Sequence, residues 1–326
     1  MSHAIVTTDF GSGTACMRIL VELPSNMLAR YATYLKRVIS GSDVVVRLLF
    51  EPRLLATLRD KACGLEPDRA RQRGAVLSTL YRVTFELRPQ RISSLMNSSS
   101  IRNIFWANLR VSQRIKDAGL HAQLMGSGMT VAAVPAKSGN VTVKLRYNRY
   151  INIEEGDFIL FVECDGCVVH FLTFSFCTGM TGQPDQAAIL IGGSQGCQPH
   201  LREFRRHLVR DCFDIAPEEV LILAIRGLAR KFGCGSILAV GCDIHSKAIV
   251  DTDYEQMKPQ LEKSYDMFWL SHAARRHSDY YLFDVSEDPI PSAVPAGEHK
   301  ARKLRKRGLK RHILACAEGL WEGERA

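Results

Sequence analysis

The sequence predicts an α+β protein in which an N-terminal helical region precedes a mixed β-sheet flanked by helices. Up to about residue 119 apolar residues recur at helical spacing, whereas beyond it short apolar runs alternate with turn residues. Asp165-Gly166 separates two of these runs, and both residues tolerate the positive φ of a two-residue hairpin. The length of 326 residues indicates about two domains.

The N-terminal region, residues 1–119, is predicted to be helical. Its helices are expected over 28–39, 52–62, 75–87 and 101–118. Pro24 and Pro52 suit first-turn positions, because a proline there gives up no helical hydrogen bond. Gly119 is expected to end the last helix.

Residues 120–288 are predicted to form the α+β domain with the hairpin at its centre. Counting outward from the turn places Val162 opposite Val169 and Leu160 opposite Phe171. Both faces of the hairpin are apolar, so we expect it inside the sheet. Strands are expected over 130–134, 141–147, 158–164, 167–176, 187–193, 236–240 and 280–285, and helices over 200–209, 217–232 and 261–274.

The composition limits the class of protein. Hydrophobic residues make up 46% of the chain and charged residues 24%, which is typical of a globular protein. No apolar run approaches the roughly 20 residues of a membrane helix, and no basic segment followed by an apolar core opens the chain. We therefore expect a cytoplasmic protein whose ten cysteines are reduced and which binds no metal.

Residues 289–326 are predicted to form a proline-rich linker and a basic helix. Of the net charge of +9, eight positive charges lie between residues 300 and 311 with no acid among them. Lys303 and Arg307 are the candidate contacts of this segment with an anionic membrane surface or with cofactor phosphates. A solvated face is the alternative. Nucleic acid is not an expected partner, because few aromatic residues are interleaved.

Five segments between about residues 48 and 314 carry distinctive motifs, and their order along the chain is informative. They are Ile191-Gly192-Gly193-Ser194-Gln195-Gly196, the helix–strand unit 217–240, His245, Tyr265-Asp266-Met267-Phe268-Trp269 and the basic stretch from Lys303. In this order they resemble the bacterial VirK/YbjX family. The resemblance implies a protein connected with envelope integrity, virulence or antimicrobial-peptide resistance, with no agreed reaction.

The predicted order of hairpin, strand, glycine turn, helices and strand also resembles acyl-CoA N-acyltransferases of the GNAT type. This resemblance implies an acyltransferase whose thioester donor, acyl-CoA or an acyl-carrier protein, places its phosphates on backbone N–H groups after the central strand. The candidate donor-binding residues are Gly192, Gly193, Ser194, Gln195, Gly196, Arg202, Arg205 and Arg206. A tight turn without a ligand is the alternative, and the rival function is a non-catalytic binding or regulatory protein linked to envelope stress.

Three residues are candidates for the catalytic base. Glu163 and His170 are expected on one face of the hairpin, about 7–8 Å apart at the backbone, where their pKa values would shift. A structural Glu–His hydrogen bond is the alternative. His245 follows a buried strand, where α/β sites often open, and Cys242 nearby is a conceivable nucleophile. An enzyme should bring His170 or His245 into the cleft of the glycine segment.

The aromatic motif admits two interpretations. Tyr265, Phe268 and Trp269 recur at helical spacing, which is typical of a core stripe. Tyr265, Asp266 and Trp269 are also candidate contacts for a substrate or partner.

Overall fold

The structure is a computed structural model. It describes residues 4–6, 19–21, 56–60, 86–87, 92–115, 118–137, 139–148, 155–196, 199–245, 254–286, 288–290 and 299–320. The helices predicted over 28–39, 52–62 and 75–87 lie largely outside these residues, as does most of the proline-rich linker. Two short strands, β1 (Ala4–Val6) and β2 (Ile19–Val21), pair antiparallel where the periodicity predicted no strand.

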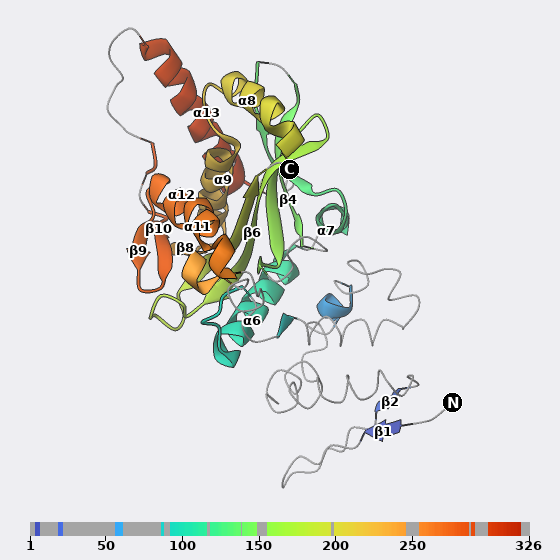
Figure 1. The fold of residues 1–326 in the computed structure, drawn as a ribbon. Helices are drawn as coiled ribbons and strands as arrows, with labels where there is room; N and C mark the ends of the chain where they lie inside the picture. The colour runs from blue at the N-terminus through green and yellow to red at the C-terminus, as the bar shows by residue number, and fades with distance from the viewer. Residues whose placement is uncertain are drawn as a thin grey trace.

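An eight-stranded sheet in the order β3-β4-β5-β6-β7-β8-β10-β9 lies at the centre of the described chain (Figure 1). Its strands are β3 (Met129–Val134), β4 (Val141–Tyr147), β5 (Phe158–Cys164), β6 (Cys167–Thr178), β7 (Ala187–Gly196), β8 (Ser236–Val240), β9 (Arg275–His277) and β10 (Tyr280–Asp284). All neighbouring pairs in this sheet are antiparallel except β7 and β8, which run parallel. The predicted mixed α+β fold is therefore confirmed.

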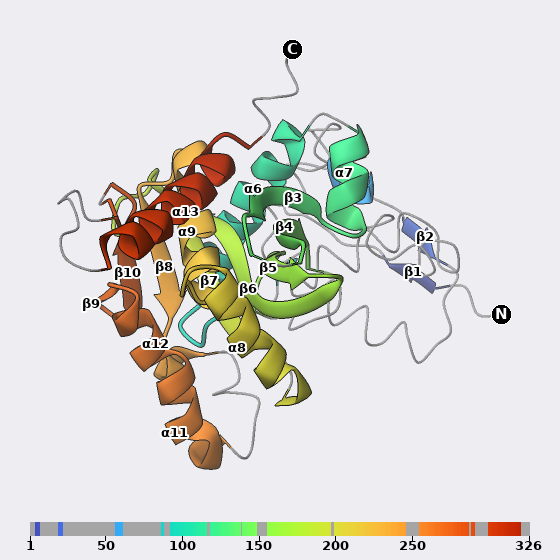
Figure 2. The same ribbon diagram turned by 90° about the horizontal axis from the view of Figure 1, so that it is seen from above.

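Helices cover both faces of the sheet (Figures 1 and 2). They are α6 (Ser98–Arg114), α7 (Ala118–Met125), α8 (Arg202–Asp211), α9 (Pro217–Lys231), α11 (Tyr254–Ser264), α12 (Asp266–Ser271) and α13 (Lys300–Glu318), with short 3-10 turns η2 (Pro199–Leu201) and η3 (Cys242–Ile244). Alternate residues of β7 face opposite layers, so Ile189 and Ile191 join the core under α9, while Ala188 and Leu190 pack with α6. The helix α13 lies on α9.

The sequence of α9 explains its place at the centre of one layer. Pro217 occupies the first turn, two glutamates follow it, and Arg230 and Lys231 close the last turn, which complements the helix dipole. Gly227 lets α13 approach, because a Cβ at this position would lie 2.6 Å from the Ala317 Cβ. The two helices therefore cross with almost no space between their backbones.

Two predicted helices, over 101–118 and 261–274, have different boundaries in the structure. The helix α6 begins after Asn97, whose side chain accepts a hydrogen bond from the Ser100 N–H, and α7 runs through Gly119. The helix expected over 261–274 is divided at Tyr265, which lies between the end of α11 at Ser264 and the start of α12 at Asp266. Ala273 then adopts a positive φ of 64°, which ends the helical segment before β9.

The predicted hairpin is confirmed, but its register is wrong beyond the turn. Val162 lies opposite His170, not Val169, and Leu160 lies opposite Leu172, not Phe171. A β-bulge between residues 162 and 163 of β5 gives β6 one extra residue, which shifts all later pairs by one.

This bulge separates two of the predicted catalytic residues. Residues opposite one another in an antiparallel pair share a face, so His170 lies on the face of Val162, and Glu163 points to the other face. The predicted same-face pair of Glu163 and His170 is therefore wrong. Glu163 instead forms an ion pair with Lys144 of β4 at 2.5 Å.

Candidate functional site

The glycine segment continues a strand where a turn was predicted. Residues up to Gly196 pair with β6, and Gly196 lies opposite His170. The parallel pairing between β7 and β8 ends at Ile191 and Ala239. Beyond this point the two strands separate, and residues 192–196 border the opening.

Protein side chains and backbone fill the inner part of this opening. A Cβ on Gly192 would lie 1.9 Å from the Glu155 carbonyl oxygen, and a Cβ on Gly193 would lie 2.0 Å from Glu155 Oε2. Thr173 Oγ1 donates to Glu155 Oε2 at 3.3 Å. The two glycines thus accommodate Glu155, which occupies the space beside them.

His245 belongs to the same buried cluster. Its Nε2 lies 3.6 Å from Glu155 Oε1, and both side chains are almost fully buried. Its ring packs against Tyr265 with 4.8 Å between centroids. Because His245 has no exposed surface, it cannot contact a substrate in this structure. Burial raises the pKa of Cys242 to about 12, so this thiol is not an activated nucleophile.

The aromatic motif, residues 265–269, packs against the end of β8 through two hydrogen bonds. Trp269 donates its indole N–H to the Val240 carbonyl at 2.9 Å, and Asp266 Oδ1 accepts from the Cys242 N–H at 3.1 Å. Tyr265 and Trp269 are buried, which confirms the predicted core stripe. The two side chains offer no surface to a partner.

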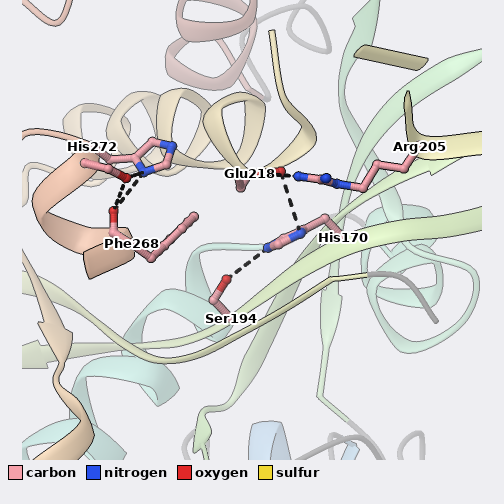
Figure 3. Close-up of polar contacts among 7 residues, drawn as sticks. His170, Ser194, Arg205, Glu218, Phe268 and His272 are labelled. Atoms are coloured by element: carbon pink, nitrogen blue, oxygen red, sulfur yellow. Dashed lines mark hydrogen bonds and ion pairs between the residues drawn. The ribbon is translucent and has the colours of Figure 1, made fainter. Parts of the chain in front are cut away.

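A second cluster lies at the outer end of β7 (Figure 3). His170 Nε2 lies 2.9 Å from Ser194 Oγ, so β6 and β7 bring a hydroxyl to an imidazole. On the other side of the ring, His170 Nδ1 lies 3.9 Å from Oε2 of Glu218, in the first turn of α9. Arg205 of α8 donates to Glu218 Oε1 at 2.5 Å. The His170 ring therefore lies between the Ser194 hydroxyl and the Glu218 carboxylate.

The environment sets the charges of this cluster. Burial lowers the pKa of His170 to about 4, although the nearby carboxylate of Glu218 opposes the shift. Burial works against ionisation of Glu218, but hydrogen bonds from Arg205 and from a backbone N–H outweigh it, and the pKa of Glu218 is lowered. At neutral pH the imidazole is neutral and the carboxylate is ionised. Glu218 lies beyond hydrogen-bond distance of Nδ1, but its negative charge favours a proton on that nitrogen. In that tautomer Nε2 accepts the Ser194 hydroxyl proton.

The cluster is covered on one side and open on the other. The Phe268 ring stacks on His170 with 6.4 Å between centroids, and His272 packs behind Phe268. Ser194 is half-buried, whereas the next two residues, Gln195 and Gly196, are exposed. Ser194 is therefore partly accessible to solvent at the end of β7.

The other residues predicted for the site do not contact the His170 imidazole. Arg202 and Arg206 are exposed on α8, where only Arg205 turns toward Glu218. Lys303 is exposed on α13, and Arg307 is half-buried there. Glu218 was not among the predicted residues, because an acid in the first turn after a proline is an ordinary helix start.

Fold and cluster together define a mixed α/β protein with a serine–histidine–glutamate site where two parallel strands separate. A family model described as proteins of unknown function, DUF535, matches residues 76–288. The chain belongs to this family, which includes the VirK/YbjX proteins. No curated protein matches the chain significantly.

Two further properties hold for the described part of the chain. It contains no helix that is both long and apolar enough to cross a membrane. Within the same residues, no three His, Cys, Asp or Glu side chains are grouped as metal ligands would be.

Proposed function

We propose that this protein is an acyltransferase and that Ser194, His170 and Glu218 form its catalytic centre. The proposal is carried by the 2.9 Å contact between His170 Nε2 and Ser194 Oγ, with the Glu218 carboxylate 3.9 Å from the opposite ring nitrogen. This arrangement serves acyl transfer on several unrelated folds, so it is recognised by geometry and not by sequence position.

The strand order supports the same chemistry. Five antiparallel strands, β3 to β7, are followed by a helical crossover to the parallel strand β8. This order resembles the GNAT acyltransferases, in which the donor pairs with the central strand. The cluster of Ser194 and His170 borders the corresponding separation of β7 and β8. Likeness of topology is a weaker argument than the site itself.

The donor is an acyl thioester, either acyl-CoA or an acyl-carrier protein. Since Glu155 fills the space at Gly192 and Gly193, the thioester carbonyl lies farther out, beside Ser194 and the exposed backbone of Gln195 and Gly196.

The neutral imidazole permits a two-step reaction. Ser194 Oγ attacks the thioester carbonyl carbon while His170 Nε2 takes the hydroxyl proton; the C–S bond breaks and the thiol leaves with that proton. An amine or hydroxyl of the acceptor then attacks acyl-Ser194. His170 takes the acceptor's proton and returns it to Ser194 Oγ as the ester bond breaks. Glu218 stabilises the imidazolium formed in each step.

Intact-protein mass spectrometry after incubation with acetyl-CoA or palmitoyl-CoA tests the proposal. The wild-type protein should gain the mass of one acyl group, and Ser194→Ala should gain none. His170→Gln should slow acylation by about 10²–10⁴-fold. Ser271→Ala is the matched control, because Ser271 Oγ also contacts a histidine, His272, at 3.0 Å, outside the proposed centre.

Two results would contradict the proposal. Acylation of Ser194→Ala at the wild-type rate would exclude Ser194 as the nucleophile. Absence of both acylation and thiol release with CoA and carrier-protein donors would favour the rival function, a non-catalytic binding or regulatory protein linked to envelope stress.

A further inference from the structure

A basic basin lies between α8, the turn that follows it and the start of α13. Its volume is about 570 Å³. The lining residues are Lys137, Arg210, Phe213, Asp214, His299, Ala301, Arg302 and Arg305. These side chains are distinct from those around His170, so the basin is a second candidate site.

The positive charge of the basin is only partly balanced. Asp214 is its one carboxylate, and Arg302 already binds it, with Nε donating to Asp214 Oδ2 at 2.6 Å. Within the described part of the chain, Lys137, Arg210 and Arg305 form no ion pair. Three cations therefore face solvent around one basin.

The start of α13 adds to this imbalance. Its N-cap residue, His299, makes no side-chain capping hydrogen bond, and its first turn contains no acid. Lys300, Arg302 and Lys303 stand there instead. Cations at the positive end of a helix dipole oppose helix formation, whereas an anion bound there would favour it.

The turn on the other side of the basin is strained. Phe213 and Asp214 have φ values of 55° and 61°, in the left-handed region that non-glycine residues rarely adopt. This geometry brings the Phe213 ring beneath Lys137, whose Nζ lies 5.8 Å from the ring centroid. Strain of this kind is found preferentially at functional sites.

We propose that this basin binds a phosphate group. Arginine guanidinium groups match phosphate oxygens in pairs, and the free N–H groups at the start of α13 supply further donors. Arg210 of α8 and Arg305 of α13 both line the basin, and Lys137 lies over the Phe213 ring. The phosphate belongs either to a small soluble ligand or to the headgroup of an anionic lipid. The site goes beyond the proposed acyl transfer and does not depend on it.

Two probes distinguish the sources of the phosphate in the full-length protein at low salt. Isothermal titration with inorganic pyrophosphate tests a soluble ligand. Co-sedimentation with phosphatidylcholine vesicles, with and without phosphatidylglycerol, tests a lipid headgroup. Binding of one probe should weaken about tenfold or more in Arg210→Gln and in Arg305→Gln, because each loses charge-assisted hydrogen bonds.

Arg311→Gln is the matched control, because Arg311 is an exposed cation of the same helix outside the basin. It should change binding less than about twofold. The proposal is overturned if neither probe binds the wild-type protein, if both basin variants bind as the wild type does, or if Arg311→Gln weakens binding as much as Arg305→Gln.

Discussion

His170 Nε2 lies 2.9 Å from Ser194 Oγ because the two residues are diagonal neighbours on adjacent strands. The residue directly opposite His170 is Gly196, and Ser194 lies two residues before it on the same face of β7. The bulge beside Glu163 decides which face of β6 carries the ring. The contact thus depends on one extra residue in β6.

The buried imidazole should make stability depend on pH. Well above pH 6.5, the ordinary pKa of histidine, His170 is neutral in both the folded and the unfolded chain. As the pH falls from 6.5 toward 4, the unfolded chain binds a proton that the folded chain does not, so the free energy of unfolding decreases. The full loss is about 3 kcal/mol. Urea unfolding at several pH values should show this loss in the wild-type protein and a smaller one in His170→Gln.

The control for this measurement is His207→Gln, which replaces an exposed histidine of α8. Its free energy of unfolding should follow the wild-type pH dependence. If the His170→Gln curve were parallel to the wild-type curve over the same range, the imidazole would not be buried and neutral as the structure has it.

Most of the sheet was predictable from sequence, because its strands are short apolar runs bounded by turn residues. The run 236–240 and the hairpin at Asp165-Gly166 were predicted as they occur. Register was not predictable beyond the first two pairs, because a bulge leaves no mark in a run that is apolar on both faces. One extra residue was enough to separate Glu163 from His170.

The candidate site was predictable only in part. His170 and Ser194 were both singled out, one as the expected same-face partner of Glu163 and the other within a glycine-rich motif. Their contact follows from strand pairing that no short motif encodes. Glu218 could not be identified, because its role arises from the packing of α9 on the sheet and from Arg205 on the neighbouring helix.

Glu163→Gln should leave acyl transfer unchanged and lower stability by less than about 1 kcal/mol, because the pair of Glu163 and Lys144 is partly exposed. Acylation assays and urea unfolding check both values. Loss of acylation comparable to that of His170→Gln would mean that Glu163 acts in catalysis after all.

Gly192→Ala should destabilise the protein by several kcal/mol or prevent folding, because the added methyl group would overlap the Glu155 carbonyl oxygen. Gly196→Ala is the matched control on the same strand. Its nearest neighbour would be His170 Nδ1 at 3.5 Å, an ordinary contact, so it should fold normally. Thermal unfolding of the two variants makes the comparison; equal stability would contradict the filled opening between β7 and β8.

Two helical glycines should respond in opposite directions to replacement by alanine. Gly227→Ala should lower the free energy of unfolding by about 1–3 kcal/mol, because its Cβ would lie 2.6 Å from both the Ala317 Cβ and the Leu314 carbonyl oxygen. Gly308→Ala should raise it by about 0.5–1 kcal/mol, since alanine favours the helix and no atom lies within 4 Å of the added methyl group. Urea unfolding of both variants separates the effect of packing from that of helix propensity. If Gly227→Ala were stabilised like Gly308→Ala, α13 would not lie against α9 at this position.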